Sequence, residues 1–91
     1  GVMDDKDVDG IVTALNPCAT RFICSTPDTP RAVAASELAE RVRRLSGPTP
    51  VSTEPNSWHA VETSLNRSRT VCVTGSIFLV GEVRSVIERL K

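Results

Sequence analysis

Residues 70–84, TVCVTGSIFLVGEVR, decide the fold class, because a strand pattern and a helix pattern meet there at one glycine. Residues 70–74 are rich in β-branched side chains, which favour a strand. Gly75 and Ser76 predict a turn into a helix that runs to the end of the chain. The side chains expected on the buried side of this helix are Leu79, Val80, Val83, Val86, Ile87 and Leu90.

Earlier parts of the chain repeat this order of short apolar runs and helical segments. Residues 21–25, RFICS, predict a strand that is covered on both faces. Thr29 followed by Pro30 predicts the start of a helix over residues 31–45, since an N-cap oxygen followed by proline is a common helix start. Its expected buried stripe is Ala35, Leu38, Ala39, Val42 and Leu45.

Three further segments complete the pattern. Residues 8–15 have helical spacing and end at Asn16-Pro17. Residues 48–55 predict either a short edge strand or an extended loop. Asn56 or Ser57 is expected to cap another helix, which carries Trp58, Val61 and Leu65 on one side.

Strands that alternate with helices predict an α/β domain, with a Rossmann-like, mostly parallel sheet and flanking helices. We expect one domain over residues 1–91. The opening Gly1-Val2-Met3 has the character of a strand end, so we expect a domain truncated at its N-terminus. Such a truncation would leave an unpaired edge through which the chain could self-associate.

The composition limits the classes of function that this chain could have. Eleven Lys and Arg balance eleven Asp and Glu, which argues against nucleic-acid binding because that function needs a basic face. No stretch reaches the length of a membrane span. Three cysteines, an odd number without CxxC spacing, indicate free thiols in a reducing cytoplasm. Cys24 and Cys72 lie in apolar runs and are expected to be buried and inert.

The candidate site is the sheet edge at the carboxyl ends of the strands, where α/β proteins bind ligands. Three loops leave strands there: residues 4–7, residues 25–31 and residues 74–76. Lys6, Arg31 and Ser76 would share this rim, and together they suit a carboxylate or a phosphate. The competing interpretation is structural, with the Asp residues of 4–7 and Ser76 serving as helix caps and Arg31 as a surface cation.

Other chemistry finds little support. The sequence contains neither GxGxxG nor GxxxxGK[ST], so it has no phosphate loop of its own. His59 is the only histidine, which disfavours a metal site. No nucleophile-elbow pattern surrounds Ser76. We therefore expect no catalytic residue and no bound metal in this chain.

The order of the rim motifs resembles one enzyme family. The motifs are VMDDKD at residues 2–7, TPDTPRA at residues 26–32, Glu37-Leu38, and VTGSIFLVGEVR at residues 73–84. In this order and spacing they resemble the C-terminal, Mur ligase-like domain of folylpolyglutamate synthase/dihydrofolate synthase. The resemblance covers nearly all 91 residues.

The resemblance implies an ATP-dependent ligase that adds L-glutamate to dihydropteroate or folate through an acyl phosphate. ATP and Mg²⁺ would be bound mainly by an N-terminal ATPase domain of the same protein, which is absent from this chain, and the fragment alone would hold no cofactor and be inactive. Lys6 and Ser76 fall where relatives contact the incoming glutamate. Asp5, Asp7, Arg31 and Gly75 are further candidates at the rim.

One departure from the family concerns the D-G-A-H-N segment that approaches the nucleotide, which is missing here together with its following helix. Two alternatives remain. The chain could be a free-standing flavodoxin-like or receiver-like domain that binds phosphate at the same rim, or an interaction domain without a ligand.

Overall fold

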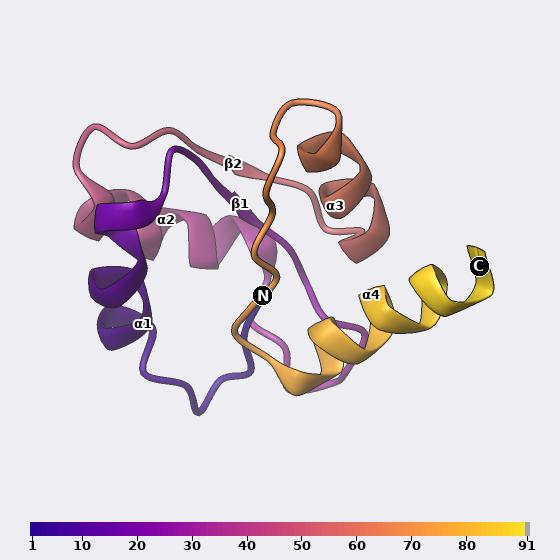
Figure 1. Cartoon of the computed structure of the whole chain (residues 1–91). Helices are drawn as coiled ribbons and strands as arrows, with labels where there is room; N and C mark the ends of the chain where they lie inside the picture. The colour runs from indigo at the N-terminus through magenta and orange to yellow at the C-terminus, as the bar shows by residue number, and fades with distance from the viewer. Residues whose placement is uncertain (91) are drawn as a thin grey trace.

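The computed structural model of the chain describes residues 1–90 and shows helices packed around a small sheet (Figure 1). The chain order is helix α1 (Val8–Leu15), a 3₁₀ turn (Asn16–Cys18), strand β1 (Phe22–Cys24), helix α2 (Ala35–Ser46), strand β2 (Val51–Thr53), helix α3 (Ser57–Leu65) and helix α4 (Ile77–Leu90).

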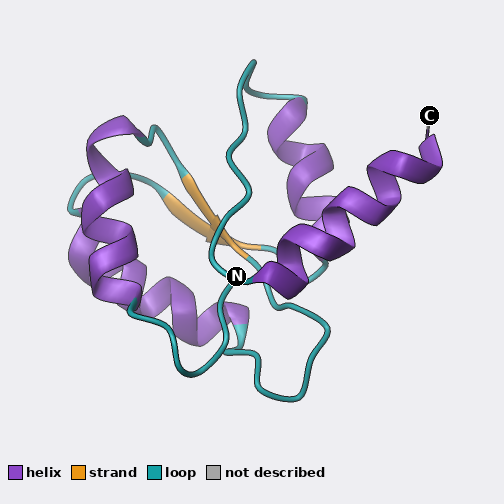
Figure 2. Cartoon of the chain, turned by 60° about the horizontal axis from the view of Figure 1, so that its bottom comes forward, coloured by secondary structure: helices purple, strands orange, loops and turns teal. Residues whose placement is uncertain are grey.

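The two strands are parallel, with Phe22 opposite Val51 and Cys24 opposite Thr53. Helix α2 connects them, so β1, α2 and β2 form a βαβ unit. Helices α1 and α2 lie on one side of the strands, and α3 and α4 lie on the other (Figure 2). The expected α/β class is confirmed, and the segment 48–55 contains the short strand rather than only a loop.

The prediction of a sheet strand at residues 70–74 is wrong, because the sheet that residues 1–90 form contains only β1 and β2. These residues are not part of a strand; Val71 and Val73 are half-buried, whereas Thr70, Cys72 and Thr74 are exposed. The alternation is that of a strand, but β2 occupies one edge of β1, and a cavity lies between residues 70–74 and the other edge. The β-branched side chains of residues 70–74 therefore favour an extended backbone, but no neighbouring strand in the described part of the chain pairs with it.

The start of α2 is also corrected, from residue 31 to Ala35. Residues before it pair with the beginning of the chain instead: Met3 and Ala32 form an antiparallel bridge, and the N–H of Val33 donates to the carbonyl of Val2 at 3.0 Å. Helical backbone over residues 31–34 would break these bonds. Thr29 and Pro30 form a turn rather than a helix cap.

Thr26 caps α2 from a distance in sequence. Its Oγ1 accepts the N–H of Ala35 at 2.9 Å, whereas the residue before the helix, Ala34, offers no side-chain cap. We predict that Thr26→Val, which keeps the shape and removes the acceptor, lowers the free energy of unfolding by about 1 kcal/mol. Urea unfolding measures it. The exposed Thr13→Val is the matched control, and an equal loss in both variants would contradict the capping role.

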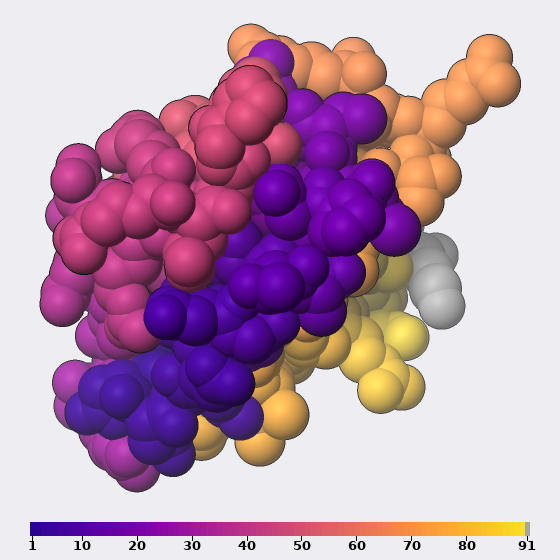
Figure 3. Space-filling view, turned by 90° about the vertical axis from the view of Figure 1, so that its left-hand side faces the viewer, coloured from indigo at the N-terminus to yellow at the C-terminus, as the bar shows by residue number. Residues whose placement is uncertain are grey.

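The main core lies between α1, α2 and the sheet. Its buried members are Val2, Val8, Val12, Cys24, Val33, Leu38, Ala39 and Val42. In the space-filling view from this side, the first residues of the chain and those of the α2–β2 region form a continuous surface (Figure 3). Helices α3 and α4 are also in contact, and each contributes two buried residues, Ala60 and Val61 from α3 and Leu79 and Val83 from α4.

Several apolar residues are more exposed than the sequence pattern predicts. Of the six expected inward residues of α4, Leu79 and Val83 are buried, whereas Val80, Ile87 and Leu90 are exposed. Leu45 and Leu65 are also exposed. Cys24 is buried as expected, but Cys72 is exposed, because residues 70–74 do not enter the sheet.

Candidate functional site

The predicted rim is present as a set of connected loops at one end of the molecule (Figure 1). The loop after β1 bonds to residues 4–7 through Arg31, whose carbonyl accepts the N–H of Asp4 at 2.9 Å. The same loop reaches α4, where the N–H of Asp28 donates to Oε1 of Glu82 at 2.5 Å. The loops around Lys6 and Arg31 and the start of α4 therefore belong to one surface.

Arg31 is already paired. Its Nη2 lies 2.9 Å from Oδ1 of Asp4 and 3.6 Å from Oδ2 of Asp5, and its Nε donates to the same Asp4 oxygen at 3.2 Å. More than half of each side chain is exposed, so the pair contributes little to stability. The guanidinium fork is directed at these two carboxylates, and a ligand at this point would share them.

Lys6 is exposed at the tip of the 4–7 loop. Its backbone is fixed by two hydrogen bonds, from its N–H to the carbonyl of Met3 and from Val8 N–H to its own carbonyl. Its ammonium makes no ion pair with any residue in the part of the chain that the structure describes, residues 1–90. Lys6 is therefore the rim cation available to a ligand.

Asp7 and Ser76 both act as helix caps. Oδ1 of Asp7 accepts the N–H of Gly10 at the start of α1, at 3.1 Å. Oγ of Ser76 accepts the N–H of Phe78 at 3.0 Å, and Ser76 is only 1% exposed. The structural interpretation of these residues accounts for their contacts, and a role for Ser76 in ligand binding stays a prediction.

Gly75 is fixed by its surroundings. Its φ is +110°, and a Cβ at this position would collide with the carbonyl of Gly1. The start of the chain therefore lies directly against the turn that leads into α4. Only glycine combines this backbone angle with so close a neighbour.

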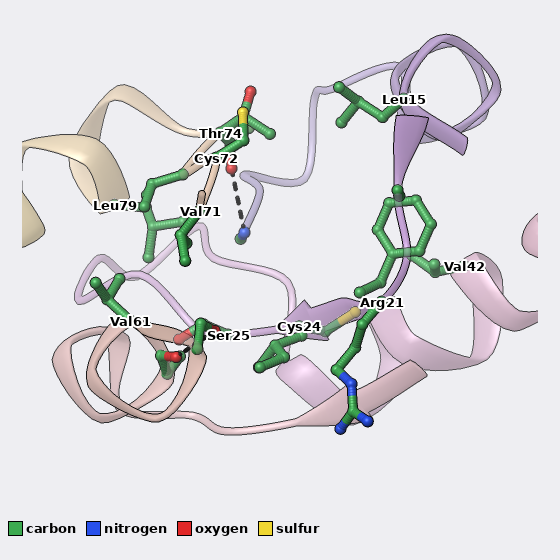
Figure 4. Close-up of a pocket in the computed structure, with 18 of the residues that line it drawn as sticks. Leu15, Arg21, Cys24, Ser25, Val42, Val61, Val71, Cys72, Thr74 and Leu79 are labelled. Atoms are coloured by element: carbon green, nitrogen blue, oxygen red, sulfur yellow. Dashed lines mark hydrogen bonds between the residues drawn. The ribbon is translucent and has the colours of Figure 1, made fainter. Parts of the chain in front are cut away.

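The amino group of Gly1 is a feature that the sequence did not reveal. It donates to the carbonyl of Thr74 at 3.4 Å. Burial lowers the pKa of this amine from its ordinary value, and the nearby Cys24 partly opposes the shift. Burial likewise raises the pKa of the Cys24 thiol. Both residues line the cavity beside β1, which Figure 4 shows in close-up, and burial there disfavours the charged forms of the two groups.

Three other contacts were also missed by the sequence analysis: Asp4 as the main partner of Arg31, Thr26 as the cap of α2, and Glu82 as the acceptor for Asp28. Each joins residues distant in the sequence. The spacing rules for helices and turns apply only to residues a few positions apart, so they cannot predict these three contacts.

Within residues 1–90, no group of three or more His, Cys, Asp or Glu side chains is arranged to hold a metal ion. In the same range, no helix combines the length and apolar character needed to cross a membrane.

No family model matches the chain. The chain is 30% identical to the dihydrofolate synthase/folylpolyglutamate synthase of Mycobacterium tuberculosis; the match covers 97% of the chain and 21% of that protein. It also superposes on M. tuberculosis folylpolyglutamate synthase complexed with ADP, with a TM-score of 0.82 and 31% identity, over 93% of the chain and 22% of that structure.

The chain thus spans about a fifth of the length of the relatives that it matches. Sequence and structure agree on the same relative, at an identity above chance and over almost every residue. The resemblance to folylpolyglutamate synthase/dihydrofolate synthase that the rim motifs indicated is confirmed.

Proposed function

We propose that the chain is the glutamate-binding part of an ATP-dependent ligase that joins L-glutamate to dihydropteroate or folate. The observation that carries this proposal is the structural match, because a TM-score of 0.82 with 31% identity over 93% of the chain supports a shared role as well as a shared fold. The proposed role is to bind the incoming amino acid and to help close the active site.

The charges of the rim support an amino acid as the ligand. Four carboxylates, of Asp4, Asp5, Asp7 and Asp28, stand with the two cations Lys6 and Arg31. A phosphate would meet repulsion from most of these groups, which disfavours the flavodoxin-like or receiver-like alternative. Glutamate carries an ammonium as well as carboxylates, so it can pair with both signs of charge at this surface.

Lys6 is proposed to bind a carboxylate of glutamate. Its exposed ammonium is held on a loop with a fixed backbone, and the cation makes no ion pair among residues 1–90. Ser76 and Gly75 are proposed to shape the same site, Ser76 by fixing the start of α4 and Gly75 by the turn before it. Asp5, Asp7 and Arg31 are proposed as neighbouring rim contacts.

ATP and Mg²⁺ are proposed to be bound by the remainder of the ligase, in the N-terminal ATPase domain. The lack of a phosphate loop in this sequence supports the placement of the nucleotide in that domain. We place the chain in the cytoplasm, where folate ligation would supply one-carbon metabolism.

We predict that the isolated 91-residue chain neither hydrolyses ATP nor ligates glutamate. The measurement is ADP release in the presence of Mg²⁺, glutamate and dihydropteroate or folate. The ligase that contains this chain, assayed under the same conditions, is the positive control. ATP turnover by the chain alone would contradict the assignment of nucleotide chemistry to another domain.

The proposed activity itself is tested on that longer protein. ADP formation is expected to depend on both glutamate and a pteroate or folate substrate, with a product whose mass is increased by one glutamyl group. ADP formation that is independent of glutamate, or that requires another amino acid, would overturn the proposal.

A further inference from the structure

The loop that carries Lys6 is joined to the loop after β1 through one residue, Arg31. Among residues 1–90, every hydrogen bond and ion pair from residues 4–6 to a segment beyond residue 10 goes to this arginine. Asp4 makes most of these contacts. Its N–H donates to the carbonyl of Arg31 at 2.9 Å, and its Oδ1 accepts from Nε at 3.2 Å and from Nη2 at 2.9 Å.

Arg31 itself lies on a loop that is held in place from two sides. The N–H of Asp28 in this loop donates to Oε1 of Glu82 in α4. Ala32, which follows Arg31, forms an antiparallel bridge with Met3. Arg31 is therefore a fixed point, and the contacts of Asp4 with it set the position of the loop of residues 4–7.

The pair of Asp4 and Arg31 is exposed, with 59% and 58% of the two side chains accessible to solvent. An exposed ion pair contributes little to folding stability. Two donors of a planar guanidinium that meet one carboxylate oxygen do, however, restrict how the two groups lie relative to each other. Lys6 follows Asp4 by two residues, and its N–H bonds to the carbonyl of Met3 at 3.3 Å, so its position depends on that of Asp4.

We propose that Asp4 is a positioning residue for glutamate binding. By its pair with Arg31 it holds the loop of residues 4–7 in the arrangement in which Lys6 reaches a carboxylate of the substrate. This inference rests on the proposed function and gives Asp4 no direct contact with glutamate. If a released loop adopted the binding arrangement about a tenth of the time, the apparent affinity for glutamate would fall about tenfold.

The charge of Asp4 alone predicts the opposite effect. Asp4 is a carboxylate two residues from the cation that is proposed to bind a carboxylate, so its field repels that part of the substrate. If Asp4 acted only through this field, removing it would lower the KM for glutamate. The positioning role predicts that the same substitution raises this KM, so the direction of the change separates the two effects.

The test uses the ligase that contains this chain, with steady-state kinetics in which glutamate is varied. Asp4→Ala is expected to raise the glutamate KM about tenfold, while kcat changes by less than about twofold. Asp9→Ala is the matched control. It removes an exposed carboxylate of α1 that lies 3.8 Å from its partner Arg41, and it should leave the glutamate KM unchanged.

Two further variants test whether Asp4 acts through Arg31 and Lys6. Exchanging the charges, by Asp4→Arg together with Arg31→Asp, places an ion pair at the same two positions and should return the KM to within about threefold of the unmodified enzyme. In the Lys6→Ala enzyme, Asp4→Ala should raise the KM by less than about twofold, because the residue that it positions is already gone.

A glutamate KM that falls or stays unchanged in Asp4→Ala would overturn the proposal. A raised KM that the charge exchange does not restore, or that is raised equally in the Lys6→Ala enzyme, would assign Asp4 a direct contact with the substrate instead and would also overturn it. The Tm of each variant is measured, because a merely structural contact would lower the Tm and leave the KM unaltered.

Lys6→Ala alone separates this inference from the proposed function on which it rests. An unaltered glutamate KM in Lys6→Ala would overturn both the binding role of Lys6 and the positioning role of Asp4. A raised KM in Lys6→Ala combined with an unaltered KM in Asp4→Ala would overturn the positioning role only.

Discussion

Replacing Lys6 by alanine in the ligase that contains this chain is expected to raise the KM for glutamate strongly. Losing a charge-assisted contact between the ammonium and a carboxylate costs about 1.5–3 kcal/mol, which corresponds to about a 10- to 150-fold increase. The KM for ATP should change little, because the nucleotide is proposed to be bound in another domain. Steady-state kinetics in which glutamate and ATP are varied separately measure both constants.

Two controls separate binding from stability. Arg44→Ala removes an exposed cation from the last turn of α2, which takes no part in the rim loops, and is expected to leave both KM values unchanged. Ser76→Ala removes the hydroxyl that caps α4, so it should lower the Tm and change the glutamate KM less than Lys6→Ala does. A Lys6→Ala enzyme with an unaltered glutamate KM would remove Lys6 from the site.

Substituting alanine for Gly75 is expected to have the largest effect on stability. The φ of +110° is strained for any L-residue, and the new Cβ would meet the carbonyl of Gly1. Together, strain and overpacking should lower the free energy of unfolding by about 2–4 kcal/mol. That loss is a large part of the stability of a small domain. Chemical denaturation of the 91-residue chain measures it.

Gly81 provides a matched control within the same region. It lies inside α4, and a Cβ there would meet no atom within 4 Å. Gly81→Ala should therefore stabilise the chain by about 0.5–1 kcal/mol, because alanine favours a helix over glycine. If Gly75→Ala were as harmless as Gly81→Ala, the close approach of the chain start to the α4 turn would be wrong.

The sequence predicted those elements whose signals are local. Residues 8–15 and the helix capped by Asn56 were placed correctly, since their apolar spacing and cap residues lie within a few positions of each other. The start of α2 was not, because Thr26, nine residues before Ala35, supplies the cap, and residues 31–33 pair with residues 2–4. No pattern near residues 31–33 in the sequence indicates that they pair with residues 2–4.

Residues 70–74 are a second case in which a local pattern does not predict a non-local contact. Their β-branched pattern favours a strand, but a sheet also requires a neighbouring edge, which this segment lacks in the structure. The exposure of Val80 and Ile87 on α4 follows the same principle, since the spacing of apolar residues marks a face without specifying what covers it.

The sequence likewise predicted some features of the candidate site and not others. The rule that ligands bind beyond the carboxyl ends of parallel strands correctly predicted that the loops carrying Lys6 and Arg31 would meet. It could not predict that Arg31 would pair with Asp4 and Asp5, because that pairing joins loops that are distant in the sequence. The cap formed by Ser76 is a local contact with Phe78, and the structural interpretation of the sequence included it.

The most direct test of the proposed role is a crystal structure of the ligase that contains this chain, with glutamate and a nucleotide bound. We expect a glutamate carboxylate oxygen about 2.7–2.9 Å from Nζ of Lys6, the distance of a charge-assisted hydrogen bond. The nucleotide phosphates should lie on the other domain. A structure in which every contact to glutamate comes from residues outside this chain would contradict the proposal.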